Sequence, residues 1–163
     1  MYLELRDIIH VPDASKPFQF QMDLSEMEFY GQRPVSRPVF IEGRVTNHAG
    51  ALVLEGSAAS LLDLRCDRCG KAFSREQTAR LDCLLADRLE DEDQDGIVLL
   101  EGTRVDLDEV AGTAFILGMD TKNLCSEDCR GLCGRCGADL NDGPCGCRPE
   151  ADPRLAALLR PPQ

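Results

Sequence analysis

The spacing of the nine cysteines constrains this chain more than any other feature. Eight of them fall in four close pairs: Cys66 and Cys69, Cys125 and Cys129, Cys133 and Cys136, and Cys145 and Cys147. Two pairs have C-x-x-C spacing followed by a glycine, Gly70 or Gly137, which is typical of a knuckle that aims two thiolates at one ion. Four thiolates in tetrahedral geometry suit Zn²⁺ better than other common metals. The cysteines therefore predict structural zinc.

The grouping of the ligands is not fixed by spacing. We expect two sites, one made by Cys133, Cys136, Cys145 and Cys147, and one made by Cys66, Cys69, Cys125 and Cys129. The second of these would pin the cysteine-rich tail to the strands that precede it. The alternative is a single site within the tail, made by Cys125, Cys129, Cys133 and Cys136.

Other uses of cysteine are weighed against zinc. Disulfides are disfavoured by the odd count and by the cytosolic location argued below. A thioredoxin-like redox pair is expected at a helix start in a βαβ unit, whereas Cys66 follows a strand pattern. An iron-sulfur cluster could use the same sulfurs, and spacing alone does not reject it. The ninth cysteine, Cys83, alternates with Leu81 and Leu85, so we expect a small buried hydrophobic side chain there.

The first hundred residues have the pattern of strands. Apolar and polar side chains alternate through residues 18–24 and 39–45, then through 52–66 and 73–85 on either side of a turn at Gly70. Gly, Pro and Asn separate these runs. We therefore expect an antiparallel sheet or a small open barrel.

Helical spacing begins at Asp106, whose side chain can cap the first free amides, and Gly118 is a plausible stop. The apolar positions with this spacing are Leu107, Val110, Ala111, Ala114 and Leu117. Residues 106–118 are thus predicted to form one helix covering the sheet. A further short helix is predicted from Asp152, with Pro153 in its first turn.

These patterns predict an α+β protein with two parts. Residues 1–119 form a strand-rich domain with its covering helix, and residues 120–163 form a cysteine-rich, zinc-binding tail. The segment from 124 to 147 holds six cysteines and five glycines with little apolar content, so burial alone cannot fold it.

The net charge of −11 comes mainly from the first part of the chain. Residues 1–119 hold 22 acidic and 12 basic side chains, whereas residues 120–163 hold 7 and 6. Binding to nucleic acid without sequence preference depends on excess Lys and Arg, so this charge argues against a general nucleic-acid clamp and favours a basic partner. Two four-thiolate zinc sites, each carrying about −2, would strengthen that preference.

Much of the excess lies in one acidic run: Asp87, Glu90, Asp91, Glu92, Asp93 and Asp95. We interpret it as a solvated loop, because closely spaced like charges repel one another and stay hydrated. The alternative is a docking segment for a basic protein.

The location is expected to be cytoplasmic, with no membrane partner. No run approaches the ~18 apolar residues that a membrane helix needs. The start of the chain also lacks the basic-then-apolar pattern of a secretion signal.

Catalysis is not expected from this sequence. The chain has two histidines, His10 and His48, as candidate general bases by residue type, and both are read as surface or turn residues. Phosphate-binding, dinucleotide-binding and nucleophile-elbow motifs are absent from the sequence. Sites made of four cysteines are closed and structural, because no position is left for water.

One basic patch surrounds the first C-x-x-C pair and consists of Arg65, Arg68, Lys71, Arg75 and Arg80. Asp67 and Glu76 oppose it, which leaves a local balance of +3. If these side chains share the polar face of a hairpin, that edge could contact RNA phosphates. The alternative is a set of arginines on a solvated strand face, partly neutralised by thiolates.

Four segments closely resemble the YceD family, the large ribosomal RNA subunit accumulation proteins: CDRCGKAF at 66–73, VDLDEVAGTAFILGM at 105–119, LCSEDCRGLCGRCGADLNDGPCGC at 124–147 and DPRLAALLR at 152–160. The resemblance implies a small bacterial cytosolic protein needed for accumulation of large-subunit ribosomal RNA, with a role in precursor processing or subunit assembly. Some relatives lack the tail cysteines, so zinc is inferred here from the residues themselves.

Charge and resemblance together favour a non-enzymatic assembly factor. We expect it to bind a basic ribosomal protein or an rRNA-processing factor, because an acidic protein encounters basic partners readily at low salt. Direct RNA binding through the edge from Arg65 to Arg80 is the second hypothesis. A redox or metal sensor is the third.

Overall fold

The computed structural model describes residues 1–88 and 96–147. Its main element is an open five-stranded sheet with the order β2-β3-β4-β5-β6. The strands are β2 Ser15–Met22, β3 Val39–His48, β4 Ala51–Arg65, β5 Ala72–Ala86 and β6 Ile97–Leu99. Neighbouring strands are antiparallel except β6, which runs parallel to β5. The expected α+β class is confirmed with an open sheet, and β6 is a parallel addition that the sequence pattern did not predict.

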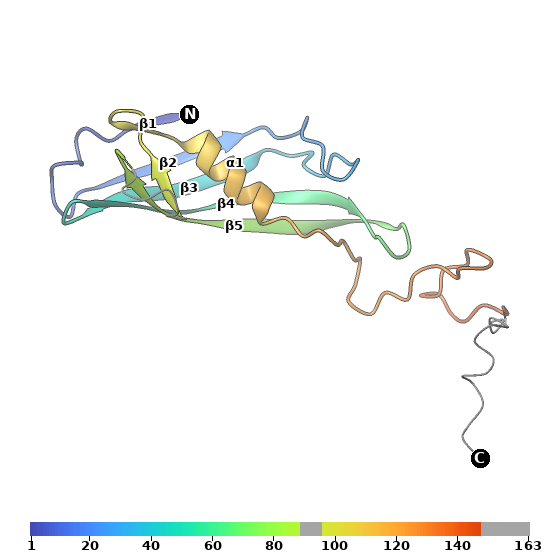
Figure 1. Cartoon of the computed structure of the whole chain (residues 1–163). Helices are drawn as coiled ribbons and strands as arrows, with labels where there is room; N and C mark the ends of the chain where they lie inside the picture. The colour runs from blue at the N-terminus through green and yellow to red at the C-terminus, as the bar shows by residue number, and fades with distance from the viewer. Residues whose placement is uncertain (89–95, 148–163) are drawn as a thin grey trace, which may run out of the picture.

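A second layer covers one face of this sheet. β1 (Tyr2–Glu4) pairs antiparallel with β7 (Arg104–Asp106), and α1 (Leu107–Leu117) follows β7 directly. The helix lies along the sheet over β4 and β5 (Figure 1). The Asp106 side chain accepts a hydrogen bond of 3.0 Å from the backbone amide of Asp108, so the predicted cap is present. The single covering helix expected from the sequence is therefore confirmed.

The face that α1 buries differs from the expected one at one position. Leu117 is 79% exposed, whereas Phe115 is fully buried. Helical geometry explains the difference, because Leu107, Ala111 and Phe115 recur every four residues on the side facing the sheet. Leu117 lies two residues beyond Phe115 and so points away from the sheet.

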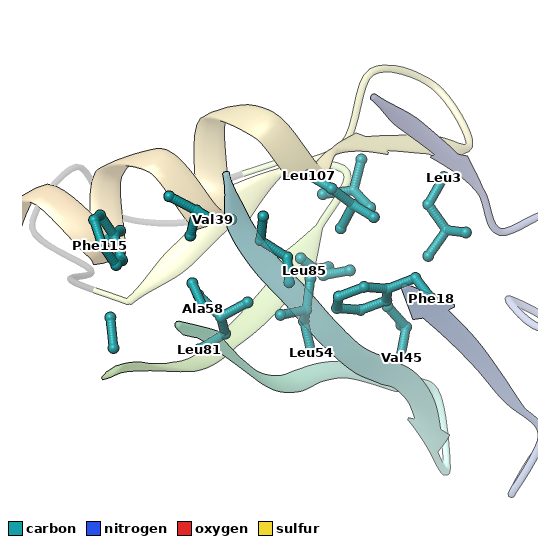
Figure 2. Close-up of a cluster of buried hydrophobic side chains, with 14 of the residues drawn as sticks. Leu3, Phe18, Val39, Val45, Leu54, Ala58, Leu81, Leu85, Leu107 and Phe115 are labelled. Atoms are coloured by element: carbon teal, nitrogen blue, oxygen red, sulfur yellow. The ribbon is translucent and has the colours of Figure 1, made fainter. Parts of the chain in front are cut away.

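The hydrophobic core fills the space between the sheet and the second layer. Figure 2 shows side chains from both layers meeting there, among them Leu3, Phe18, Val45, Leu54, Leu81, Leu107 and Phe115. Cys83 is partly buried and packs against this core. Among the described residues, Met119 is the last one that belongs to this core.

Strands β4 and β5 form a hairpin that carries two features of interest. Each strand has 15 residues, and at about 3.3 Å per residue such a strand spans roughly 45 to 50 Å. Cys66 and Cys69 lie in the turn at one end, and Asp87 follows β5 at the other. The other residues of the acidic run lie outside the described residues, and so does the helix predicted from Asp152.

After Met119 the chain leaves the sheet and continues beside the turn of the β4–β5 hairpin (Figure 1). Among the described residues of 120–147 there is no helix or extended strand. In the whole described part of the chain, residues 1–88 and 96–147, no helix is long and apolar enough to cross a membrane.

Candidate metal centres

Eight cysteines gather into two clusters whose sulfur atoms lie within 4.8 Å of one another. Centre 1 consists of Cys66, Cys69, Cys125 and Cys129. Centre 2 consists of Cys133, Cys136, Cys145 and Cys147. These are the two sets of four expected for two sites, and the four cysteines of the single-site alternative are divided between them. Both clusters could hold a metal ion.

The sulfur spacing in centre 1 fits a tetrahedral ion. The Sγ atoms of Cys66 and Cys129 are 3.7 Å apart, and those of Cys69 and Cys125 are also 3.7 Å apart. Four sulfurs bound at about 2.3 Å from a tetrahedral Zn²⁺ are separated by about 3.8 Å, whereas a disulfide joins its sulfurs at about 2.05 Å. All nine cysteines are free thiols. The donor set of centre 1 therefore matches a four-thiolate metal site.

Each centre contains a knuckle with the same backbone geometry. The amide of Gly70 donates to the carbonyl of Cys66 at 2.8 Å, and the amide of Gly137 donates to the carbonyl of Cys133 at 2.9 Å. Both glycines have left-handed φ angles, +71° and +70°. Because side chains with a Cβ rarely adopt that region, glycine is required to close each turn. The sequence C-x-R-C-G thus builds the same half-site twice.

Backbone amides make one thiol in each centre unusually acidic. The amide of Cys125, together with those of Cys69 and Arg68, lowers the pKa of Cys66 to about 6. The amides of Cys136 and Arg135 lower the pKa of Cys133 to about 6 in the same way. Each knuckle therefore presents a thiolate at neutral pH, which is the form that binds metal.

The opposite shift occurs at a second thiol of each centre. The amide of Lys71 lowers the pKa of Cys69, but burial and the neighbouring sulfurs outweigh it and raise the value to about 12. The nearby Cys136 sulfur, followed by burial, raises the pKa of Cys147 to about 12. Crowded thiols cannot all ionise beside one another, so full deprotonation requires a cation among them.

Centre 1 joins the tail to the sheet. Cys66 and Cys69 come from the β4–β5 turn and are 3% and 8% exposed, and Cys129 from the tail is 2% exposed. The Arg68 guanidinium donates to the carbonyl oxygen of Cys129 at 2.7 Å. These contacts make centre 1 an attachment point between two parts of the chain that are distant in sequence.

A polar cluster next to centre 1 reinforces this attachment. Asp67 and Asn123 exchange two hydrogen bonds, with the amide of Asn123 donating to the Asp67 carboxylate at 2.6 Å and the amide of Asp67 donating to the Asn123 carbonyl at 2.8 Å. Arg75 donates to the Asn123 side chain at 3.0 Å and pairs with Asp120 at 3.1 Å. Centre 2 lies wholly within the tail and contains Cys136, which is exposed.

The five basic side chains proposed as an RNA edge do not share one face. Arg75 lies opposite the buried Leu62 on the side of the sheet that faces the helix, whereas Arg65 and Arg80 lie on the other side. Arg68 and Arg75 contact the tail, and Arg80 pairs with Asp82 at 3.0 Å. Lys71 is exposed beside the knuckle. RNA contact by these residues stays a prediction.

Sequence reasoning missed the residues that hold the tail in place. The sequence pattern places Arg68 in the basic patch and gives no reason to single out Asn123 or Asn141. One signal was present in the sequence, because both knuckles read C-x-R-C-G and so place an arginine at the same position, Arg68 and Arg135. A residue type that recurs inside a metal knuckle favours a structural role over a contact with a partner.

Comparison with known families relates this chain to one by its sequence over most of its length. A family model described as Large ribosomal RNA subunit accumulation protein YceD matches residues 54–160. The matched region begins within β4 and includes all eight clustered cysteines. Comparison with curated proteins and with solved structures finds no match.

Proposed function

This chain belongs to the YceD family of large ribosomal RNA subunit accumulation proteins, and we propose that it acts as a non-enzymatic assembly factor for the large ribosomal subunit. In this role it supports accumulation and processing of large-subunit ribosomal RNA in the cytoplasm by binding a basic ribosomal or rRNA-processing protein. The family match over residues 54–160 is the observation that carries the proposal.

Both centres bind Zn²⁺ in this proposal. The gathering of four thiols in each centre, and the spacing of 3.7 Å between sulfurs of different pairs in centre 1, support zinc over a disulfide or a redox pair. Four cysteine ligands leave no position for a bound water, so zinc here gives shape to the tail and does not supply a nucleophile.

Charge supports a protein partner over RNA. The chain carries a net charge of −11, and each four-thiolate zinc site makes the net charge of the zinc-loaded protein more negative by about 2. Arg68, Arg75 and Arg80 are engaged within the chain, which reduces the positive surface available for phosphates. A basic protein is attracted to such a surface, and the attraction weakens with salt.

Deletion of the gene tests the biological role. We expect a reduced level of large-subunit ribosomal RNA and of large subunits in a sucrose-gradient profile, restored by the wild-type gene. A Cys66→Ser and Cys69→Ser double variant is expected to restore little, whereas Cys83→Ser restores fully because Cys83 belongs to neither centre. Normal large subunits in the deletion strain would contradict the proposal. If the strain instead has normal ribosomes and the protein loses metal reversibly with mild oxidant, a redox or metal sensor is indicated.

A pull-down with the zinc-loaded full chain tests the partner. We expect capture of a basic ribosomal or rRNA-processing protein from nuclease-treated extract, decreasing as salt rises. Replacing Asp91, Glu92 and Asp93 with their amides is expected to weaken capture, whereas the same charge change at the exposed Asp13, Glu28 and Glu42 is the matched control. Capture of naked RNA alone, with a steep salt dependence, would replace this proposal with direct RNA binding.

A further inference from the structure

The two centres are joined by a very short linker. Arg130, Gly131 and Leu132 are the only residues between Cys129 of centre 1 and Cys133 of centre 2. A span of four residues covers at most about 14 Å even when fully extended. A change of shape in one centre therefore displaces residues that lie close to the other centre.

Backbone hydrogen bonds connect this linker to both centres. On the side of centre 1, the amide of Leu132 donates to the carbonyl of Arg68 at 3.2 Å. Gly131 is buried with φ +73°, and a Cβ there would lie 2.9 Å from the same Arg68 carbonyl oxygen. On the side of centre 2, the amide of Leu140 donates to the carbonyl of Gly131 at 2.9 Å. The linker is thus held between the first knuckle and the loop that separates Cys136 from Cys145.

One side chain of that loop reaches a ligand of the other centre. The Asn141 Nδ2 atom lies 3.5 Å from the Cys129 Sγ atom, to which it donates a hydrogen bond. Its Oδ1 atom accepts from the Arg130 amide at 2.8 Å, and Nδ2 also donates to Asp139 at 2.7 Å. These three contacts fix the Asn141 amide group over the junction of Cys129 and Arg130.

We propose that the two centres form one cooperative metal-binding unit, in which Asn141 transmits the filling of centre 2 to the metal affinity of centre 1. A metal in centre 2 orders the loop between Cys136 and Cys145 and so holds Asn141 against Cys129. The donated hydrogen bond then stabilises Cys129 as a thiolate ligand and fixes its direction. The inference rests on the proposed zinc binding and assigns Asn141 as a positioning residue.

Thermodynamic linkage gives this inference a reciprocal form. If metal in centre 2 strengthens binding at centre 1 by some factor, metal in centre 1 strengthens binding at centre 2 by the same factor. Centre 2, the less buried of the two, then sets how firmly centre 1 attaches the tail to the sheet, since loss of metal from centre 2 weakens that attachment.

The test measures metal affinity at each centre of the full chain by chelator competition, with bound Cd²⁺ resolved by NMR to distinguish the centres. Emptying centre 2 with Cys145→Ser and Cys147→Ser is expected to weaken binding at centre 1 by about tenfold or more. Asn141→Ala is expected to have a similar effect while centre 2 keeps its metal. Combining these changes should weaken centre 1 no further than emptying centre 2 does.

Two control variants separate the link from local damage. Asp142→Asn changes the exposed neighbour of Asn141 and should leave both affinities unchanged. Asn141→Asp keeps an oxygen for the Arg130 amide but loses the donor to Cys129, so it should weaken centre 1 at least as much as alanine does. Unchanged affinity at centre 1 after centre 2 is emptied would overturn the inference. The inference would also be overturned if Asn141→Ala weakened centre 1 just as much in the variant with an emptied centre 2 as it does in the wild type. Two bound ions without cooperativity would refute only this inference, whereas fewer than two ions in the wild type would refute the zinc proposal with it.

Discussion

The sheet and the tail of this protein bury very different amounts of apolar surface. The core beneath α1 is built from aliphatic and aromatic side chains of β1 to β5, β7 and the helix, most of them buried. In the described part of the tail, residues 120–147, Cys129 and Gly131 are the only buried residues. At about 25 cal/mol per Å² of apolar surface, the sheet can be stabilised by burial and the tail cannot.

This difference assigns separate sources of stability to two parts of one chain. Conformational entropy costs the tail roughly 1 to 2 kcal/mol per ordered residue, and almost no hydrophobic burial offsets it. Metal binding is the interaction that the eight clustered cysteines can supply instead. We therefore expect treatments that act on metal to change the tail, and treatments that act on packing to change the sheet.

Removal of metal should produce the largest effect and the clearest separation. In the zinc-loaded full chain, a strong chelator under reducing conditions is expected to abolish amide-exchange protection in residues 120–147. Protection in β3, β4 and β5 should persist, because their core does not include the centres. Hydrogen exchange followed by mass spectrometry measures both regions in one sample.

Readdition of Zn²⁺ is the control for this experiment, and it should restore protection in the tail. Equal loss of protection in the sheet and the tail would contradict the separation. Unchanged protection of the tail in metal-free protein would contradict the role assigned to metal.

The second test acts on packing. Phe115→Ala removes a fully buried ring between α1 and the sheet, and it should lower the free energy of unfolding of the sheet by about 3 to 5 kcal/mol. The number of metal ions per chain should stay the same. Leu117→Ala is the matched control, because Leu117 is 79% exposed on the same helix and should change stability by less than about 0.5 kcal/mol. Urea denaturation followed by circular dichroism provides the measurement, and loss of metal in Phe115→Ala would show that the two parts are not independent.

The same contrast explains what the sequence could predict of the fold. Strand alternation reports burial on one face, so the pattern at Phe18 and around Ile41 located β2 and β3 correctly. The helix was located by its cap at Asp106, but its apolar residues occur on more than one side. Sequence alone therefore did not distinguish Phe115 from Leu117. That choice depends on the direction from which the sheet approaches, which is tertiary information.

For the candidate site, pair spacing was informative and distance along the chain was not. C-x-x-C followed by glycine fixes a knuckle locally, so both half-sites could be recognised from sequence. The partner pair of each knuckle depends on the fold, because Cys66 and Cys129 are 63 positions apart and meet at the end of the hairpin. Asn141 could not be identified as a link, since its contact with Cys129 exists only once both knuckles are placed.

The third test concerns Cys83, the thiol of the sheet, whose pKa is shifted in the opposite direction from those of Cys66 and Cys133 in the centres. Burial raises the pKa of Cys83 from 9.0 to about 11, whereas Cys66 and Cys133 have pKa values of about 6. Because the pKa is higher in the folded state, the unfolded chain loses this proton first as the pH rises. The contribution of the Cys83 thiol to the free energy of unfolding is therefore fully present below pH 9 and declines between about pH 9 and 11. Because Cys83 is only partly buried, we expect a decline of roughly 1 to 2 kcal/mol.

Cys83→Ala isolates this contribution from the other thiols that titrate at high pH. The difference in unfolding free energy between wild type and Cys83→Ala should be constant from pH 7 to 8. Above about pH 9 it should change by roughly 1 to 2 kcal/mol against the wild type. Urea denaturation at a series of pH values gives this difference, and a constant difference up to pH 11 would show that Cys83 titrates as an ordinary exposed thiol.

The smallest effect is expected at the contact that joins the two regions. Arg68→Ala removes the hydrogen bond to the Cys129 carbonyl, and at this partly exposed position the loss should be about 1 kcal/mol. That energy corresponds to about fivefold faster amide exchange in residues 123–129 if the tail opens locally, with no change in β3 or β4. Arg65→Ala, at the exposed last residue of β4, is the matched control and should leave exchange in residues 123–129 unchanged. Equal acceleration by both variants would mean that positive charge near the knuckle, and not the hydrogen bond of Arg68, keeps the tail on the sheet.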